Sequence, residues 1–354
     1  MKKLILSIVV LFIGFSACKK DLPPDNPTHT TTPVAFPKPS NFPAPNLPAD
    51  NPLTKEGIAL GRHLYYEKRM SIDNTVSCAS CHVHEYNFSL PLPYGIGVNG
   101  PTHNSVMIHS NLAWQETLLW NGFASSIEQV AYLTIIDPVE MNSTWEISLG
   151  KIENDPKYIS LYEAAYGPNA ITTENSIKAI AQFVRTMVSG DSKYDKWQRG
   201  EEQFTTLELE GYQMFNDENG DCFHCHGDYT TGGLFGAYGD LQFSNNGLDS
   251  VLLPNLGREG ATGDSNDRGK FKIPSLRNIE YSFPYMHDGR FTTLQDVIEH
   301  YNMGGHITYT IDPNMKKAGI GRNWSQEQKD ALLAFLKTLS DNAFLTDTSF
   351  SNPW

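Results

Sequence analysis

The sequence predicts a mainly α-helical protein in which two domains are joined by long loops. At 354 residues the chain is long enough for about two domains, each with its own hydrophobic core. Apolar residues recur at helical spacing in several segments, whereas the alternating pattern of β-strands is scarce. One pentapeptide pattern, in which two cysteines three positions apart precede a histidine, occurs at 78–82 and again at 222–226. This spacing suits one copy per domain.

Apolar spacing and capping residues predict the helices in order along the chain. Thr54 is a suitable cap for the first helix, and the segment 173–188 carries one continuous apolar stripe. The expected helices are 54–66, 173–188, 205–215, 293–303 and 325–339, and the segments 111–120, 125–136 and 143–154 are expected to be helical or mixed. Loops rich in Pro, Gly or Asn are expected over 91–101 and between the second pentapeptide and Gly269.

The N-terminus is typical of an export signal. Met1-Lys2-Lys3 is followed by an apolar run over 4–15 and then by Ser16-Ala17-Cys18. The apolar run is too short to span a bilayer comfortably, and no other segment is apolar enough to do so. Cys18 stands where a bacterial lipoprotein signal is cleaved and its cysteine lipidated, so a lipid anchor is expected at Cys18. The alternative is plain secretory cleavage, with Cys18 discarded or left as a free thiol.

Composition then divides the rest of the chain. Ten prolines lie between residues 19 and 52, so this stretch cannot build a core and is predicted to be a semi-extended tether. Its second half, with Phe36 and Phe42, is expected to lie along the first domain. The expected parts are a signal peptide (1–17), a tether (18–45), an N-terminal domain (46–195), a C-terminal domain (196–340) and a tail (341–354).

The two pentapeptides are attachment signals for c-type haem. Two thiols at this spacing can form thioether bonds to the two vinyl groups of one haem, and the next residue, His82 or His226, is placed to bind the iron. Cys78, Cys81, Cys222 and Cys225 account for four of the five cysteines. Structural zinc is the alternative, but zinc sites space their cysteines and histidines differently.

Haem attachment of this type and the net charge limit the location and the partners. Attachment of c-type haem takes place outside the cytoplasm, which agrees with export to the periplasm or cell envelope. The formal net charge of −13 argues against a nucleic-acid partner and is compatible with a basic redox partner.

Residues about 45–340 resemble the bacterial di-haem cytochrome c peroxidase family, which includes the MauG-like oxidase that matures a tryptophan-derived quinone. The resemblance implies two cytochrome-c-like haem domains, an N-terminal haem that meets hydrogen peroxide and a C-terminal haem that relays electrons. It rests on the motifs Cys78–His82, Leu119–Gly122, Asp137–Met141, Ile273–Asn278 and Pro284–Arg290.

The resemblance also implies catalytic residues near the first haem. Glu140, 20 positions after Trp120, resembles the family's catalytic glutamate, which moves a proton during O–O cleavage. Trp120 resembles the tryptophan between the haems and would relay electrons. A surface glutamate and an ordinary core tryptophan are the alternatives. The slot of a family glutamine holds Val130, and Gln129 stands one position early, which on a helix turns the side chain by about 100°. Thr134 replaces a proline of the family, which predicts a pocket of altered size or polarity.

The first haem is expected to have an open iron site. Many family members close this haem at rest with a second histidine, and the usual location corresponds to Val98, which cannot bind iron. His84, His103 and His109 are nearby alternatives, each expected to be structural or exposed. We therefore predict a first haem that is open without prior reduction.

Tyr301 is the predicted sixth ligand of the second haem. It stands 14 positions after His287, where the peroxidases of the family carry methionine and the MauG-like oxidase carries tyrosine. An anionic oxygen ligand favours oxidised iron and lowers the potential. Tyr301 continues the apolar stripe of its helix, whereas Met303 lies about 200° around the axis and faces away. The alternative is an ordinary core tyrosine.

The resemblance further implies one calcium ion between the haems. Asn104 matches the family's side-chain ligand, and Ser282 and Pro284 match the two residues that offer backbone carbonyls. A hard cation prefers such oxygen ligands.

Together these features imply an enzyme that reduces hydrogen peroxide to water with electrons from a small cytochrome c or cupredoxin. A MauG-like oxidase that uses peroxide to oxidise residues of a partner protein is the alternative, favoured by Tyr301 and by the missing loop histidine. A non-enzymatic di-haem electron carrier is a third possibility, against which Glu140 beside an open haem argues.

Overall fold

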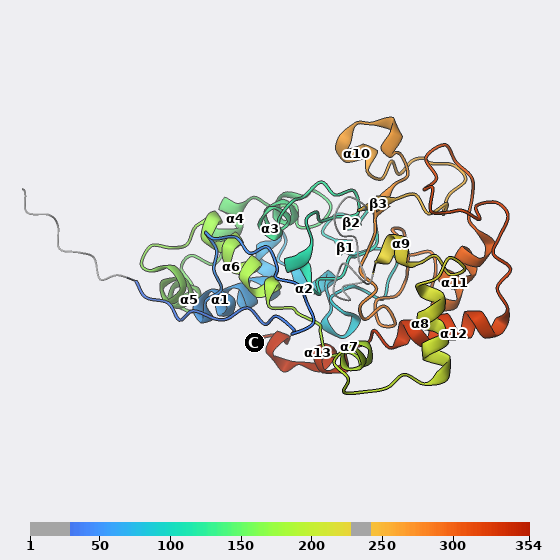
Figure 1. Cartoon of the computed structure of the whole chain (residues 1–354). Helices are drawn as coiled ribbons and strands as arrows, with labels where there is room; N and C mark the ends of the chain where they lie inside the picture. The colour runs from blue at the N-terminus through green and yellow to red at the C-terminus, as the bar shows by residue number, and fades with distance from the viewer. Residues whose placement is uncertain (1–28, 228–241) are drawn as a thin grey trace, which may run out of the picture. The chain divides into compact units, whose positions relative to one another are not determined.

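The computed structural model describes residues 29–227 and 242–354, so the expected signal peptide, Cys18 and the first part of the tether lie outside the described residues. Thirteen α-helices occur within the described residues (Figure 1), and the sheet content is limited to two antiparallel pairs of two-residue strands. Strand β1 (Ile96–Gly97) pairs with β2 (Gly100–Pro101), and β3 (Phe243–Ser244) pairs with β4 (Phe271–Lys272). The prediction of a mainly α fold is confirmed.

The first hydrophobic core is built by helices from the N-terminal half. It contains buried residues from α1, α3, α4, α5 and α6. The helices of this half are α1 (Lys55–Tyr66), α2 (Cys78–Cys81), α3 (Ile127–Ile136), α4 (Trp145–Gly150), α5 (Pro156–Tyr166) and α6 (Thr173–Arg185), with short 3₁₀ helices at Lys68–Met70, His84–Tyr86 and Leu112–Trp114.

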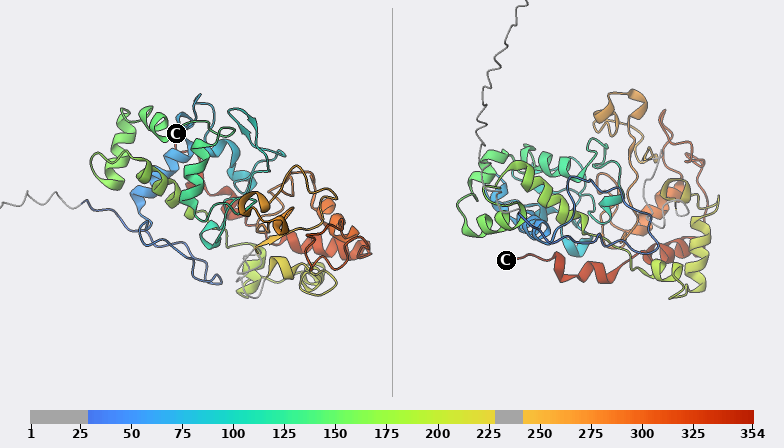
Figure 2. Two further views of the ribbon diagram at one scale, coloured as in Figure 1. Left: turned by 90° about the horizontal axis from the view of Figure 1, so that it is seen from above. Right: turned by 60° about the vertical axis from the view of Figure 1, so that its left-hand side comes forward.

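A second core is built from the C-terminal half. Buried residues of α8, α11 and α12 form its centre. The helices are α7 (Lys193–Gln198), α8 (Thr206–Phe215), α9 (Phe223–His226), α10 (Glu259–Thr262), α11 (Leu294–Met303), α12 (Gln326–Lys337) and α13 (Asn342–Thr346), with 3₁₀ helices at Ser265–Asp267 and Thr348–Phe350. In Figures 1 and 2 the blue-to-green helices of the first core gather at one end, and α8, α11 and α12 lie at the other.

The two cores repeat one helix contact. A Cβ atom at Gly61 of α1 would lie 1.9 Å from the carbonyl oxygen of Ala179 in α6, and a Cβ atom at Gly211 of α8 would lie 1.9 Å from that of Ala331 in α12. Only glycine permits so close a helix crossing. Each haem motif therefore follows a helix that is held against its partner in the same way.

The C-terminal segment does not remain in the second half. After α12 the chain returns to the first half, where α13 and the following 3₁₀ turn contribute Phe344 and Phe350 to the first core (Figure 1). His84 Nε2 donates a hydrogen bond of 2.7 Å to the carbonyl oxygen of Phe344. Residues 31–354 form one unit by their internal contacts, so the boundaries 46–195, 196–340 and 341–354 stay a prediction.

Most helix starts agree with the capping signals. Thr54, Thr205, Thr293 and Ser325 each accept a hydrogen bond from a backbone N–H in the first turn of the helix that follows. The short helices α2, α9 and α10 and the helices α5, α7 and α13 were not expected, and α10 lies in the segment expected to be a loop up to Gly269. The cap Asp155 and the following proline are a start signal for α5.

The described part of the tether follows the expectation. Val34 N–H donates to the carbonyl oxygen of Leu53, and the rings of Phe36 and Phe42 pack edge-on against Trp114. No helix among the described residues is both long and apolar enough to cross a membrane.

Candidate functional site

The main cavity of the described structure lies beside the first pentapeptide. It has a volume of about 380 Å³, and segments from both halves of the sequence line it. The cavity brings together predicted residues that are far apart in the chain: Cys78, Cys81, His82, Asn104, Trp120, Glu140, Ser282 and Pro284. The rest of the wall is mostly apolar, as a site for a porphyrin ring requires.

Helix α2 presents its two thiols and the following histidine to this cavity. Ser77 and Ser80 form a capping box that fixes the single turn between Cys78 and Cys81. Both thiols are free, and burial raises the pKa of Cys78 to about 12. His82 Nδ1 donates to the carbonyl oxygen of Phe88 at 2.8 Å, and burial lowers the pKa of His82 to about 4. The imidazole is therefore neutral, with Nε2 available to a metal, so this donor set fits a c-type haem.

Glu140 carries the one carboxyl group that described residues contribute to the cavity wall. Burial raises the pKa of Glu140 to about 7, and the nearby carboxylate of Asp137 adds to the rise. Asp137 Oδ1 also accepts the N–H groups of Val139 and Glu140, at 2.8 and 3.1 Å, which holds the backbone before the carboxyl group. Thr134 hydrogen-bonds to the Glu140 side chain and opposes the rise in pKa. The residue that replaces the family proline is thus in contact with the carboxyl group.

Gln129 has another contact. Its Oε1 accepts hydrogen bonds from the N–H and the hydroxyl group of Ser125, at 2.9 and 3.2 Å, at the start of α3. Val130, the next residue, lines the cavity instead. The structure therefore does not bring Gln129 together with Glu140 and His82.

The histidines near the first site are placed differently from one another. His84 is bound to the C-terminal segment, and His109 stacks on the ring of His82 with centroids 3.6 Å apart. His103 is exposed at the cavity wall. Val98, at the usual location of the closing histidine, donates its N–H to the carbonyl oxygen of Glu140. An open first iron site stays a prediction.

Trp120 connects the cavity with the second half of the chain. Its indole Nε1 donates to the carbonyl oxygen of Ser105 at 2.8 Å. Ser105 in turn donates its N–H to the carbonyl oxygen of His287 and its hydroxyl group to that of Met286, both at 2.7 Å. The Trp120 ring also lies edge-on to His287, with centroids 6.5 Å apart.

The second pentapeptide forms α9 and the residue before it. Cys222 and Cys225 are free thiols, and burial raises the pKa of each to about 12. The hydroxyl group of Tyr301 lies near both sulfur atoms, so a negative charge on either one would raise the pKa of Tyr301. Residues 228–241, which follow His226, lie outside the described residues. The described donors, two thiols, one histidine and one tyrosine, fit a second c-type haem.

Tyr301 belongs to the buried stripe of α11. Leu294 and Ile298 are buried, and Tyr301 packs against the same core, whereas Met303 is 67% exposed, as the helical phase predicts. Burial raises the pKa of Tyr301 to about 12. Asn246 Nδ2 donates to the tyrosine oxygen at 3.3 Å. A phenol in this environment becomes ionised near neutral pH only if a cation such as iron binds its oxygen.

The three predicted calcium ligands line one cavity. Asn104, Ser282 and Pro284 all contribute to its wall. Asn104 Oδ1 accepts a hydrogen bond of 2.8 Å from Asn255 Nδ2, a contact that a bound cation would share or replace. The calcium ion stays a prediction.

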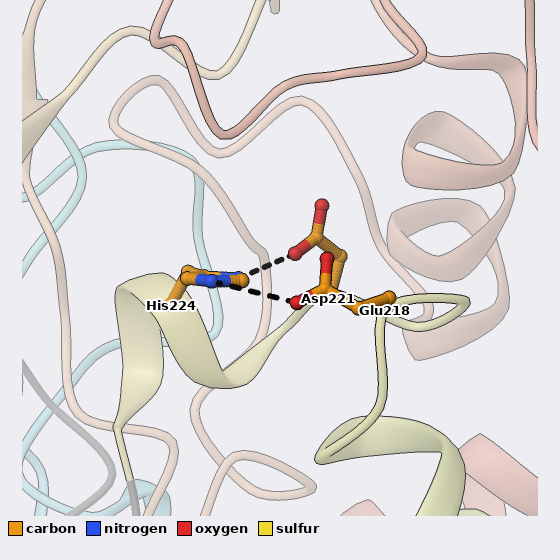
Figure 3. Close-up of side chains that lie close together, drawn as sticks. All are labelled: Glu218, Asp221 and His224. Carbon is orange, nitrogen blue, oxygen red and sulfur yellow. Dashed lines mark hydrogen bonds and ion pairs between the residues drawn. The ribbon is translucent and has the colours of Figure 1, made fainter.

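A cluster of Glu218, Asp221 and His224 adjoins the second pentapeptide (Figure 3). His224 Nδ1 lies 2.5 Å from Asp221 Oδ1, and its Nε2 lies 3.9 Å from Glu218. Lys316 pairs with both carboxylates, at 2.6 and 3.2 Å, and Arg322 pairs with Asp221. Lys316 and Arg322 provide the positive charge that a metal ion would otherwise bring to the two carboxylates. The cluster is therefore an ion-pair network that stabilises the turn before α9.

Two further polar residues near the sites were not expected. Lys272 lines the cavity within an apolar segment, and Asn246 contacts Tyr301. The sequence gives a signal for Lys272, because a basic residue between the two apolar residues Phe271 and Ile273 is unusual in a strand. No local pattern distinguishes Asn246 from its asparagine-rich surroundings.

Two thiol-thiol-histidine sites in separate helical cores, one beside a cavity with a carboxyl group of raised pKa, define a di-haem c-type oxidoreductase. The comparisons with known proteins agree. The family model described as di-haem cytochrome c peroxidase matches residues 55–203. The chain is 31% identical over 353 residues to the methylamine utilization protein MauG of Methylophilus methylotrophus, which covers 97% of this chain and 96% of that protein.

Further relatives support the same assignment. The chain is 30% identical over 309 residues to the cytochrome c551 peroxidase of Nitrosomonas europaea, with 85% of each chain covered. The crystal structure of a MauG-like protein associated with microbial copper homeostasis superposes with a TM-score of 0.84 and 33% identity, covering 91% of this chain and 99% of that chain. The chain belongs to the di-haem cytochrome c peroxidase family and is an oxidoreductase of the cytochrome c peroxidase type. Membership implies two c-type haems.

Proposed function

We propose that this enzyme reduces hydrogen peroxide to water at the haem held by Cys78, Cys81 and His82. One observation carries the proposal: Glu140 lines the same cavity as these residues and has a pKa raised to about 7. A carboxyl group that titrates near neutral pH can both accept and return a proton. The overall reaction consumes one peroxide, two electrons and two protons and yields two waters.

Each residue of the cavity has a distinct task in this proposal. When bound, the haem iron supplies the redox chemistry for cleavage of the peroxide O–O bond. The Glu140 carboxylate would take a proton from one peroxide oxygen and return it to the other, which is released as water. The His82 ring is oriented by its hydrogen bond to the carbonyl oxygen of Phe88, and its Nε2 would bind the haem iron.

Electrons are proposed to come from a small cytochrome c or cupredoxin by way of the second haem. Cys222, Cys225 and His226, with Tyr301, would hold that haem. Trp120 lies at the cavity wall and is bonded through Ser105 to the segment of His287, so it is suited to couple the two sites.

Replacement of Glu140 tests the proposal. In Glu140→Gln the amide keeps the size of the side chain but cannot carry the proton, so peroxide turnover should fall by about 10²–10⁴-fold. Glu146→Gln, an exposed glutamate in the first turn of α4, is the matched control and should keep full turnover. Haem content is measured for both. A Glu140→Gln enzyme with full haem content and undiminished turnover would refute the role.

A second candidate function is favoured by Tyr301. A tyrosine near Cys222 and Cys225, in place of a methionine, lowers the potential of the second haem and suits removal of electrons from a partner protein. In this case a partner residue loses two electrons and two protons, and peroxide is reduced to two waters. The likeness to MauG proteins supports this reading.

The two functions differ in the molecule that is oxidised at the expense of peroxide. Peroxide is added to the holoenzyme with a reduced cytochrome c, and separately with proteins that co-purify from its host. Rapid catalytic oxidation of the cytochrome supports the peroxidase. Slow cytochrome oxidation, together with a mass change at a residue of a co-purified protein, supports the oxidase.

We also propose that the enzyme is exported to the periplasm or cell envelope and anchored by a lipid at Cys18. The basic and apolar N-terminal segment supports export, and haem attachment of this type requires it. Labelling with a fatty acid in vivo should mark the wild-type protein but not Cys18→Ser, and equal labelling of both would contradict the anchor.

A further inference from the structure

Lys272 is a buried cation with no acidic partner among the described residues. Its residue is only 4% exposed, and its side chain lines the main cavity. Three lysine or arginine residues are buried among the described residues, and the other two are paired: Arg277 with Asp195 at 2.7 Å and Arg185 with Glu128 at 2.6 Å. For Lys272 no ion pair is present within the described part of the chain.

The environment of Lys272 leaves its charge uncompensated. The ammonium group has three N–H donors. Within residues 29–227 and 242–354 the ammonium group makes one hydrogen bond, to Gln115 Oε1 at 2.5 Å, and burial lowers the pKa of Lys272 to about 8. A buried charge that lacks a counter-charge is costly, so the position suits a lysine only if an anion enters the cavity.

The cavity is expected to hold one such anion source. A haem carries two propionate groups on the edge of the porphyrin away from its vinyl groups. Its vinyl groups must reach Cys78 and Cys81, whose thiols interact with Glu140. Lys272 lies in the part of the wall formed with Trp120 and Gln115: its backbone N–H donates to the carbonyl oxygen of Trp120 at 2.8 Å, and its ammonium group donates to Gln115 Oε1.

We infer that Lys272 forms an ion pair with a propionate carboxylate of the haem attached at Cys78 and Cys81. Gln115 positions the ammonium group by accepting its hydrogen bond at Oε1. The positive charge favours the reduced form of the haem, because reduction adds negative charge to the site. The strand β4, which carries Lys272 and binds the Trp120 backbone, thereby connects the propionate to the residue proposed to couple the haems.

The inference rests on haem attachment at Cys78–His82, and the experiment separates the two claims. The holoenzyme and the variant Lys272→Met are compared by haem content, by spectroelectrochemical titration of each haem, and by resonance Raman bands of the propionate groups. We expect two haems per chain in both. Without the charge, the equilibrium constant for reduction of the first haem should fall about tenfold, which corresponds to about 59 mV for a one-electron couple. The propionate bands of that haem should shift.

Control variants exclude a purely structural effect. Lys272→Arg keeps the charge and should restore both the potential and the propionate bands towards the wild-type values. Lys270→Met removes a lysine two positions earlier, which pairs with Asp267 at 3.2 Å, and should change neither. If Lys272→Met fails to load its haems, Lys272→Gln decides by the same readouts.

Two outcomes overturn the inference or its basis. A fully loaded Lys272→Met or Lys272→Gln enzyme with unchanged potential and unchanged propionate bands of the first haem refutes the ion pair. A wild-type protein that carries no haem at Cys78 and Cys81 instead refutes the attachment on which the inference depends.

Discussion

The pH dependence of peroxide turnover follows directly from the environment of Glu140. With a pKa of about 7, the ionised fraction of this carboxyl group, and with it the ability to accept a proton from peroxide, rises about tenfold between pH 6 and pH 8. The quantity to measure is kcat/KM for hydrogen peroxide in the free enzyme, and its rise should have a midpoint near pH 7. Glu140→Gln should abolish this rise.

Neighbours of Glu140 allow the midpoint to be moved in both directions. Thr134 lowers the pKa through its hydrogen bond, so Thr134→Val should shift the midpoint to higher pH. Asp137 raises the pKa by charge repulsion, so Asp137→Asn, whose amide oxygen can still accept the two backbone N–H groups, should shift it to lower pH.

The directions in which the midpoint moves in the two variants test whether Glu140 carries the proton. A profile without a midpoint between pH 6 and pH 8, or a midpoint that moves in the same direction in Thr134→Val and Asp137→Asn, would show that another group carries the proton. Glu146→Gln is again the control, because its exposed carboxyl group lies outside the cavity wall.

Four further predictions test other parts of the structure. Tyr301→Phe should change the visible and EPR spectra of the second haem, and unchanged spectra would exclude the tyrosine ligand. Trp120→Phe should slow electron transfer between the haems without loss of either haem, as followed by stopped-flow absorbance. Chelation of calcium should alter the haem spectra and activity of the wild type, and Asn104→Ala should reproduce the change without chelator. Asp195→Asn should lower the free energy of unfolding by about 3–5 kcal/mol in chemical denaturation, since it weakens the buried ion pair to Arg277; a loss below 1 kcal/mol would contradict that role.

Elements governed by neighbouring residues were predictable from the sequence. Helices α1, α8, α11 and α12 begin where a threonine or serine can accept a backbone hydrogen bond. Such a cap depends on residues three positions apart, and so its pattern survives in the sequence. The phase of α11, which buries Ile298 and exposes Met303, was predictable for the same reason.

Elements stabilised by distant contacts were not predictable. The segment after α12 looked like a free tail, but Phe344 and Phe350 complete the first core. The boundary expected after residue 195 falls within α7, whose Asp195 is buried against Arg277 from a segment 82 positions later. Both depend on surfaces that exist only after the two halves have folded.

Within the candidate site the same division holds. Resemblance identified Glu140, but only the fold shows that burial raises its pKa and that Thr134 opposes the rise. Sequence position alone made Gln129 a candidate for the pocket, whereas in the structure its amide oxygen accepts a hydrogen bond from Ser125. A shift of one position on a helix was enough to separate it from the cavity.

The sequence by itself determined the two attachment points for haem, because thioether formation and iron ligation by Cys78–His82 and Cys222–His226 need only residues within one helical turn. Tertiary structure decided how the two sites differ. It brought Glu140 and Lys272 to the cavity beside Cys78 and Cys81, and Tyr301 to the other pair of thiols. Each of these three residues is at least 59 positions away in the chain from the thiols of its own site. Charge, burial and proton affinity depend on what surrounds a group in space, and those surroundings are assembled only when distant segments pack together.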